Sequence, residues 1–115
     1  MARDELLYLR HILDAIALIE EYLQGVDEAH FIATRLLQDG VIRQIEIIGE
    51  AARHVSKDLR QTYPEIPWQD MAGMRDKLIH DYFGVDIEKV WLTVQDDLPI
   101  LKEQISGVLK DFGQG

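Results

Sequence analysis

The chain is organised around residues 74–84, which read MRDKLIHDYFG. At about 100° per residue on a helix, Arg75 and Tyr82 fall on nearly the same stripe, and His80 lies on its shoulder, about 140° from Arg75. Asp76 precedes His80 by four positions, close enough for its carboxylate to accept a hydrogen bond from the imidazole. A cation, a titratable imidazole and a phenol can therefore face one cleft, provided that the last helical turn loosens.

Around this segment, apolar residues recur at intervals of three and four, which predicts helices and no strand. We expect an all-α fold, an up-and-down bundle of four to five helices. The helices are predicted at residues 4–24, about 28–37, 41–60, 68–82 and from 87 onward, where Pro99 should kink the last one. A chain of 115 residues with 47% hydrophobic composition is predicted to form one small domain, residues 1–115.

The second helix and the residues after it carry three expectations. Asp27 is the predicted N-cap, because a short acidic side chain can accept from the first free N–H groups. Phe31, Ile32 and Leu36 are predicted to be buried on one stripe. Residues 39–40, Asp-Gly, either break the chain or form a weak point inside one longer helix.

The third predicted helix has an unusually wide apolar stripe, because Ile42, Ile47 and Ala51 add a second edge to the main one. This width predicts burial on two sides, against the domain core and, as a further option, against another subunit. Gly49 costs about 1 kcal/mol relative to alanine in a helix interior, so we expect another helix to approach it closely. His54 borders this face and is predicted to be a hydrogen-bonded surface histidine.

Composition narrows the class of protein. The net charge is −9, whereas proteins that bind nucleic acid freely are usually basic. Residues 31–60 carry five basic and four acidic side chains, so this part of the sequence repels a polyanion least. The chain has no cysteine, which excludes disulfides and thiolate metal sites and fits a reducing cytosol. With no signal peptide and no apolar run of membrane-spanning length, a cytoplasmic protein without membrane contact is expected.

The candidate chemistry is narrow. There is no His-x-x-x-His pair, no glycine-rich phosphate loop and no serine in a nucleophile elbow, so we predict no metal site and no cofactor. His80 can move protons, Arg75 can clamp an anion and Tyr82 can stack or hydrogen-bond, which suits metal-free RNA cleavage by the 2′-hydroxyl. The alternative is a solvated helix face with His80 at a favourable helix end and Tyr82 in the core, and spacing alone favours it.

Several segments resemble one family. Residues 75–82 match the Arg-x-x-x-x-His-x-Tyr motif of the HepT-like toxins, which belong to the HEPN superfamily of α-helical ribonucleases. Residues 41–52 (VIRQIEIIGEAA) resemble the third helix of that family, and residues 63–68 (YPEIPW) and 72–75 (AGMR) resemble its approach to the motif. Residues 82–86 and 90–99 resemble the segments that follow the motif in that family. The resemblance therefore covers roughly residues 36–105. One departure is Asp76, where the family often has asparagine; its carboxylate either raises the basicity of His80 or weakens phosphate binding nearby.

The resemblance implies a metal-independent endoribonuclease, the toxin of a type VII-like toxin–antitoxin module. It implies Arg75 and His80 as catalytic residues, with Asp76 and Tyr82 supporting them. Its expected partners are an RNA substrate, a second copy in a homodimer, and a cognate minimal nucleotidyltransferase antitoxin (MntA-like) that transfers AMP to Tyr82. A dimer would also supply two copies of His80, one as general acid and one as general base.

A second hypothesis is a non-catalytic helical binding module that docks a minimal nucleotidyltransferase. The acidic net charge favours this module, whereas the intact set of Arg75, His80 and Tyr82 favours the ribonuclease.

Overall fold

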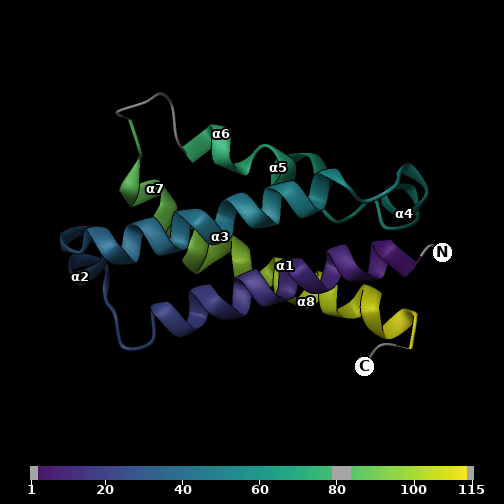
Figure 1. Ribbon diagram of the computed structural model, residues 1–115, viewed down its shortest axis with the longest axis horizontal. Coiled ribbons are helices and arrows are strands. Elements are labelled where there is room, and N and C mark those ends of the chain that lie inside the picture. The colour runs from purple at the N-terminus through teal and green to yellow at the C-terminus, as the bar shows by residue number, and fades with distance from the viewer. Residues whose placement is uncertain (1–2, 79–83, 114–115) are drawn as a thin grey trace.

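A computed structural model describes residues 3–78 and 84–113 of the chain, and its elements in that part are helical (Figure 1). The predicted all-α bundle is confirmed. The helices are α1 (Arg3–Tyr22), α2 (Glu28–Ala33), α3 (Arg35–Arg53), α4 (Lys57–Thr62), α5 (Trp68–Ala72), α6 (Met74–Leu78), α7 (Ile87–Leu92), the π-helical turn η1 (Thr93–Asp97) and α8 (Leu98–Asp111). Within the described residues, no helix is both long enough and apolar enough to cross a membrane.

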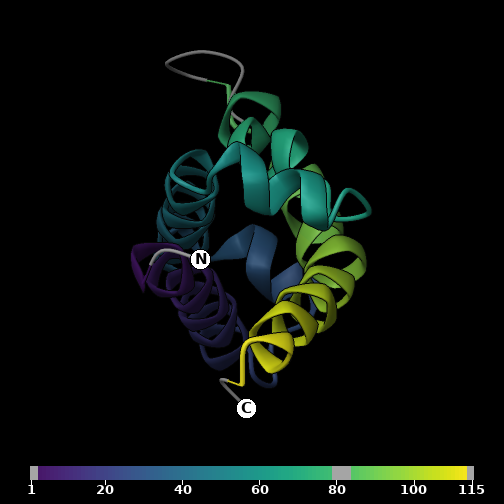
Figure 2. The same ribbon diagram turned by 90° about the vertical axis from the view of Figure 1, so that its right-hand side faces the viewer.

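The long helices α1 and α3 run antiparallel, and α8 lies along α1 (Figure 1). In the end-on view, α1, α3, α5–α6 and α7–α8 surround a common core (Figure 2). The largest fully buried side chains come from most of these layers and include Phe31, Leu9, Ile12, Ile16, Ile19, Val41, Ile45, Ile48, Met71 and Ile105. The apolar stripes that predicted α1 and α3 therefore do form the core.

α3 is buried on two sides by other helices of the same chain, as its wide stripe predicted. It packs against α1 on one side and against α5 and α6 on the other. A Cβ atom added at Gly49 would lie 3.2 Å from the carbonyl oxygen of Met71 and 3.4 Å from that of Ala72. The close approach predicted at Gly49 is confirmed, and it is the end of α5 that comes close.

The predicted second helix is too long. Asp27 caps α2 as expected, with its carboxylate accepting from the backbone N–H of His30 at 2.8 Å, and Phe31 is buried. However, Ile32 is 44% exposed and Leu36 is 82% exposed, so the predicted burial of both was wrong. The extended conformation of Thr34, φ −121° and ψ 98°, separates α2 from α3, and the two side chains no longer share one stripe.

Residues 39–40 lie inside α3. Of the two alternatives, one longer helix is therefore confirmed, and a break in the chain is not. A Cβ atom at Gly40 would lie 3.3 Å from the ring of Tyr22 on α1, so this glycine also serves a close approach.

The predicted third helix ends seven residues early, at Arg53. Ser56 caps the separate helix α4 by accepting from the N–H of Leu59 at 3.1 Å. The N–H of Ser56 in turn donates to Oε1 of Glu5, a buried carboxylate on α1, at 2.7 Å. A local cap and a side chain 51 positions away thus stabilise the break that helical periodicity missed.

The predicted helix 68–82 is interrupted at Gly73, whose N–H donates to the carbonyl of Gln69 and closes α5. α6 follows, and the end of the predicted helix lies beyond Leu78, outside the described residues. The last predicted helix is divided by η1, where Leu98 N–H donates to the carbonyl of Thr93. Pro99, the residue expected to kink this helix, lies just after the π turn in the first turn of α8, where its missing N–H cannot continue the α-helical pattern.

Candidate active site

Arg75 lies on α6 with its side chain turned toward α3. Its Nε donates to Oε2 of Glu46 at 3.3 Å, and its Nη1 lies 3.9 Å from Oδ1 of Asp76. The guanidinium side chain is 50% exposed, which leaves N–H groups free to meet an anion from solvent. The structure therefore brings together the predicted residues Arg75 and Asp76, whereas His80 and Tyr82 lie outside the described residues and their placement stays a prediction.

The local sequence fixes the position of Arg75. Gly73 ends α5, and Gly49 lets that end come close to α3. Arg53 on α3 also bonds to the end of α5, because its Nη2 donates to the carbonyl of Ala72 at 3.0 Å. At the other end of α6, Leu78 is buried and its carbonyl accepts from the N–H of Asp86 at 2.9 Å. Arg75 is thus held between two anchored points.

Two small clefts adjoin along the outer face of α3. The first, about 300 Å³, surrounds Arg75 and is lined by Asp76, Arg53, Glu46 and Glu50. The second, about 290 Å³, lies between α1 and α3 and is lined by residues that include Tyr8, His11, Arg43 and His54. Glu46 and Glu50 line both, so the two clefts form one continuous surface, called here the α3 face.

The α3 face is locally neutral in an acidic chain. Its cations Arg43, Arg53 and Arg75 match its acids Glu46, Glu50 and Asp76, and His11 and His54 add two imidazoles. The ion pairs here lie at the surface, where each contributes about 0–1 kcal/mol. A phosphate that takes both prongs of an arginine fork can therefore displace a carboxylate such as Glu46.

The α3 face also contains residues that sequence reasoning did not select. His54 is the predicted surface histidine, with Nε2 3.3 Å from Oε1 of Glu50. Its ring also stacks on Tyr8 of α1, with centroids 5.1 Å apart and planes at 24°. Tyr8 and His11 lie three positions apart on one side of α1, and this spacing was the only feature of the sequence that could have indicated their role. Nothing in the sequence indicated that they meet α3.

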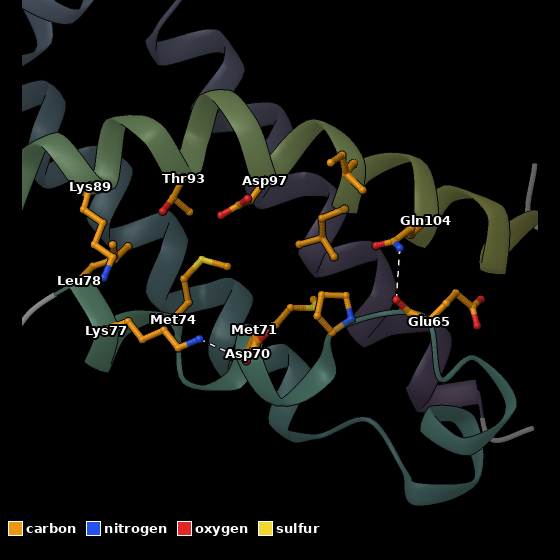
Figure 3. Close-up of a pocket in the computed structure, with 13 residues that line it drawn as sticks. Glu65, Asp70, Met71, Met74, Lys77, Leu78, Lys89, Thr93, Asp97 and Gln104 are labelled. Carbon is orange, nitrogen blue, oxygen red and sulfur yellow. Dashed lines mark hydrogen bonds and ion pairs between the residues drawn. The ribbon is translucent and has the colours of Figure 1, made fainter.

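A larger groove lies on the other side of α6. It has a volume of about 680 Å³ and runs between α5–α6 and α7–η1–α8 (Figure 3). Met71, Met74 and Leu101 contribute apolar surface, and Lys77 and Lys89 extend from opposite walls. Lys77 Nζ pairs with Oδ1 of Asp70 at 3.2 Å. Neither this groove nor its lysines were predicted from the sequence.

Within residues 3–78 and 84–113, no group of three or more His, Asp or Glu side chains is arranged to hold a metal ion.

The comparison with protein families identifies the class of this protein. The family model described as Ribonuclease HepT-like matches residues 12–108. The chain belongs to the HepT-like ribonuclease family. The resemblance noted in residues 36–105 is therefore confirmed, and the match also includes most of α1, which contributes Ile12, Ile16 and Ile19 to the core.

Curated relatives agree with this family. The chain is 46% identical to the "Probable ribonuclease HepT" of Thermococcus cleftensis, over 96% of this chain and 100% of that protein. It is 47% identical to a Methanocaldococcus jannaschii protein named "Gamma-glutamylcyclotransferase and putative RNase", over 97% of this chain. The chain spans only 50% of the length of that second relative. No solved structure matches the chain. Membership of this family supports an endoribonuclease activity with RNA as the substrate.

Proposed function

We propose that this protein is a metal-independent endoribonuclease in which Arg75 holds the scissile phosphate and His80 moves protons. The observation that carries the proposal is the half-exposed guanidinium of Arg75, held by α6 over a cleft on the α3 face of a HepT-like ribonuclease. Arginine offers a planar fork that fits two phosphate oxygens. Five residues after Arg75, His80 offers a side chain that gains and loses a proton near neutral pH.

The proposed reaction needs only proton transfer and charge stabilisation. A general base removes the proton from the 2′-hydroxyl, the 2′-oxygen attacks the adjacent phosphorus, and the bond from phosphorus to the 5′-oxygen breaks. A general acid protonates the departing 5′-oxygen, which leaves a 2′,3′-cyclic phosphate and a 5′-hydroxyl. Arg75 stabilises the charge that builds up on the phosphorane oxygens. Asp76 either supports this set by raising the basicity of His80 or weakens phosphate binding beside Arg75.

A homodimer completes the set of acid and base groups. One motif supplies one His80, whereas the reaction uses an acid and a base, and a two-fold axis that brings two motifs to one cleft supplies both. We expect the dimer to bury parts of α3 and of the predicted helix 68–82, which begins with α5 and α6, with the Arg75 and His80 pairs facing each other across the axis. Light scattering at tens of micromolar, where a dimer of working affinity is assembled, should give a dimer mass. A monomer mass would contradict this part of the proposal.

The proposed biological setting is a cytoplasmic toxin–antitoxin module of type VII, in which an MntA-like nucleotidyltransferase transfers AMP to Tyr82. The added phosphodiester would bring a negative charge near Arg75 and occupy the clamp meant for RNA, while the adenosine blocks the cleft. Incubation with the cognate transferase, ATP and Mg²⁺ should add one AMP to the wild type and none to Tyr82→Phe, by intact-mass spectrometry. Equal addition to both proteins would remove Tyr82 from this role.

The second candidate, a helical module that only docks a nucleotidyltransferase, is favoured by the net charge of −9. An RNA digestion in EDTA separates the two. The ribonuclease predicts that the wild type cleaves and that His80→Ala lowers the rate by about 10²-fold or more. His30→Ala, which changes an exposed histidine on α2, is the matched control and should cleave like the wild type. Cleavage by His80→Ala at the wild-type rate would contradict the assignment.

A further inference from the structure

His54 has an aromatic ring held on one side and open on another. Tyr8 stacks on it at a centroid distance of 5.1 Å, and Glu50 holds Nε2 at 3.3 Å. Tyr8 itself is half-buried and packs against the core, so it backs the imidazole with a rigid surface. The His54 side chain is nevertheless 54% exposed. A flat ring in a fixed orientation, with a free face, is suited to stacking against another flat ring.

The position of this ring relative to Arg75 matters. Glu46 and Glu50 lie on α3 and His54 is its C-cap residue, so the three follow one another at intervals of four residues, and Glu46 is the residue that contacts Arg75. Eight residues of α-helix rise about 12 Å, so His54 lies roughly that far along α3 from the arginine's carboxylate partner. The two clefts share Glu46 and Glu50 and leave a continuous surface between these points. A nucleotide next to the one clamped by Arg75 can span this separation.

Unpaired bases are the RNA groups that stack on aromatic side chains, histidine included. Such stacking tolerates any base, since every base has a π face. The carboxylates beside the ring, Glu46 and Glu50, disfavour a phosphate at this end but can accept from exocyclic amino groups such as N4 of cytosine. Arg43, exposed on the rim of the same cleft, can meet the following phosphate. The residues around His54 thus fit a base flanked by phosphates rather than a phosphate itself.

We infer that His54, backed by Tyr8, is a stacking platform for an unpaired nucleobase next to the scissile phosphate. The inference rests on the proposed function and deepens it, because it makes single-stranded RNA the substrate class. A base held in a duplex cannot reach the ring, since its faces are already stacked on its neighbours. His54 is therefore a positioning residue, whereas Arg75 and His80 carry the chemistry.

The test is equilibrium binding in the His80→Ala background, where cleavage of the RNA is expected to be at least about 10²-fold slower. Binding is measured for a single-stranded oligoribonucleotide and for a series of copies in which one base at a time is removed. With His54 present, removal of one particular base should weaken binding by about ten-fold. In His54→Ala the intact RNA should already bind about ten-fold more weakly, and removal of that base should cost little more, which is the coupling expected of a direct contact.

His54→Phe keeps the flat ring and loses both nitrogens, so it should retain most of the binding and the same sensitive base position. His30→Ala, on α2, should bind like the parent protein. His54→Phe as weak as His54→Ala would overturn the inference, because the imidazole would then act through charge or hydrogen bonding. A base-removal effect that persists in His54→Ala, or no RNA binding at all, would also overturn it.

These outcomes are distinguishable from failure of the proposed reaction. If the wild type does not cleave RNA in EDTA but the coupling between His54 and one base is found, the platform stands and the metal-independent reaction fails. If the wild type cleaves and the coupling is absent, the reaction stands and the platform fails.

Discussion

The two sides of α6 offer different environments from nearly adjacent residues. Arg75 faces α3, where arginines, carboxylates and imidazoles alternate around two small clefts. Lys77, two positions later, faces the groove against α8. Met71, Met74 and Leu101 supply the apolar surface of this groove, and charged side chains such as Lys89 and Asp97 also line it. The groove is the larger space, about 680 Å³ against about 300 Å³ around Arg75. Size therefore does not decide between the two as the proposed RNA site. The α3 face offers forked arginine donors that can exchange carboxylates for phosphate oxygens, whereas the groove offers lysines, which act as point charges.

The comparison also explains why α6 is short and separate. An uninterrupted helix from Trp68 would set the directions of Met71 and Arg75 by helical periodicity alone. The break at Gly73 lets α5 bury Met71 while α6 presents Arg75 to Glu46. Both sides thus depend on the contact between the end of α5 and Gly49.

The largest expected effect comes from filling that contact. In Gly49→Ala the new Cβ would meet two backbone carbonyls at 3.2 and 3.4 Å, and these cannot rotate away as a side chain could. We expect a loss of about 1–3 kcal/mol in the free energy of unfolding, measured by urea denaturation, because overpacking outweighs the gain in helix propensity. RNA cleavage should fall as well, since α5 and α6 must shift away from α3.

Gly107→Ala is the matched control, because Gly107 lies inside α8 and nothing comes within 4 Å of its added Cβ. It should stabilise the protein by about 0.5–1 kcal/mol and leave cleavage unchanged. If Gly49→Ala stabilised the protein as Gly107→Ala does, the close approach of α5 to α3 would not be a tight one.

A smaller effect on RNA affinity is expected when the carboxylate that pairs with Arg75 is neutralised, and no effect when the carboxylate that pairs with Lys77 is neutralised. Glu46→Gln removes the charge that competes with RNA phosphate for Arg75, so RNA should bind up to about five-fold more tightly, the equivalent of a surface ion pair of about 1 kcal/mol. Asp70→Asn makes the same change for Lys77 in the groove and should leave RNA affinity unchanged. Fluorescence anisotropy with a labelled single-stranded RNA measures both. Tighter binding by Asp70→Asn alone would move the RNA to the groove side.

The smallest effect concerns the loop before α5, which packs on α8. Tyr63 Oη donates to Oδ2 of Asp111 at 2.8 Å, and this hydrogen bond together with the nearby negative charge raises the pKa of Tyr63 above its ordinary value of 10.0. Tyr63→Phe should cost at most about 1 kcal/mol at neutral pH, since the bond is exposed.

The pH dependence of that difference has a definite sign. Because the folded-state pKa of Tyr63 is raised, the stabilisation is complete below the unfolded pKa near 10 and is lost as pH rises through the folded value. Urea titrations of the wild type and Tyr63→Phe should therefore converge above pH 10. A difference that grows with pH would contradict the assigned hydrogen bond. RNA cleavage by Tyr63→Phe should stay at the wild-type rate, because this contact lies away from the α3 face.

The sequence predicted long periodic elements better than their ends. Apolar stripes that continue over several helical turns predicted α1 and the centre of α3, because burial of one face dominates the stability of a long helix. The ends depended on single capping contacts: Ser56 with the distant carboxylate of Glu5, Gly73 after α5, and the extended Thr34. Only the Glu5 contact joins residues far apart in sequence, and the other breaks are set by the local capping or backbone conformation of single residues. Apolar periodicity carries no information about either kind.

The candidate site shows the same division. The motif predicted Arg75 and its neighbour Asp76, and the structure places both at the edge of the α3 face. The stack of Tyr8 on His54 could not be predicted, because its two rings lie 46 positions apart on different helices and meet only through the packing of α1 on α3. The predicted roles of His80 and Tyr82 concern residues outside the described part of the chain and rest on the resemblance.

The central claim, that RNA is cleaved on the α3 side of α6, is tested most directly by two substitutions two residues apart. Single-turnover cleavage of a single-stranded RNA in EDTA is measured for the wild type, Arg75→Ala, Arg75→Lys and Lys77→Ala. We predict a loss of about 10²-fold for Arg75→Ala and only partial activity for Arg75→Lys, because lysine is a point charge without the fork. Lys77→Ala, which faces the groove, should cleave within about two-fold of the wild type, as expected for a charge outside the site. Wild-type cleavage by Arg75→Ala, or an equal loss in Lys77→Ala, would contradict the account.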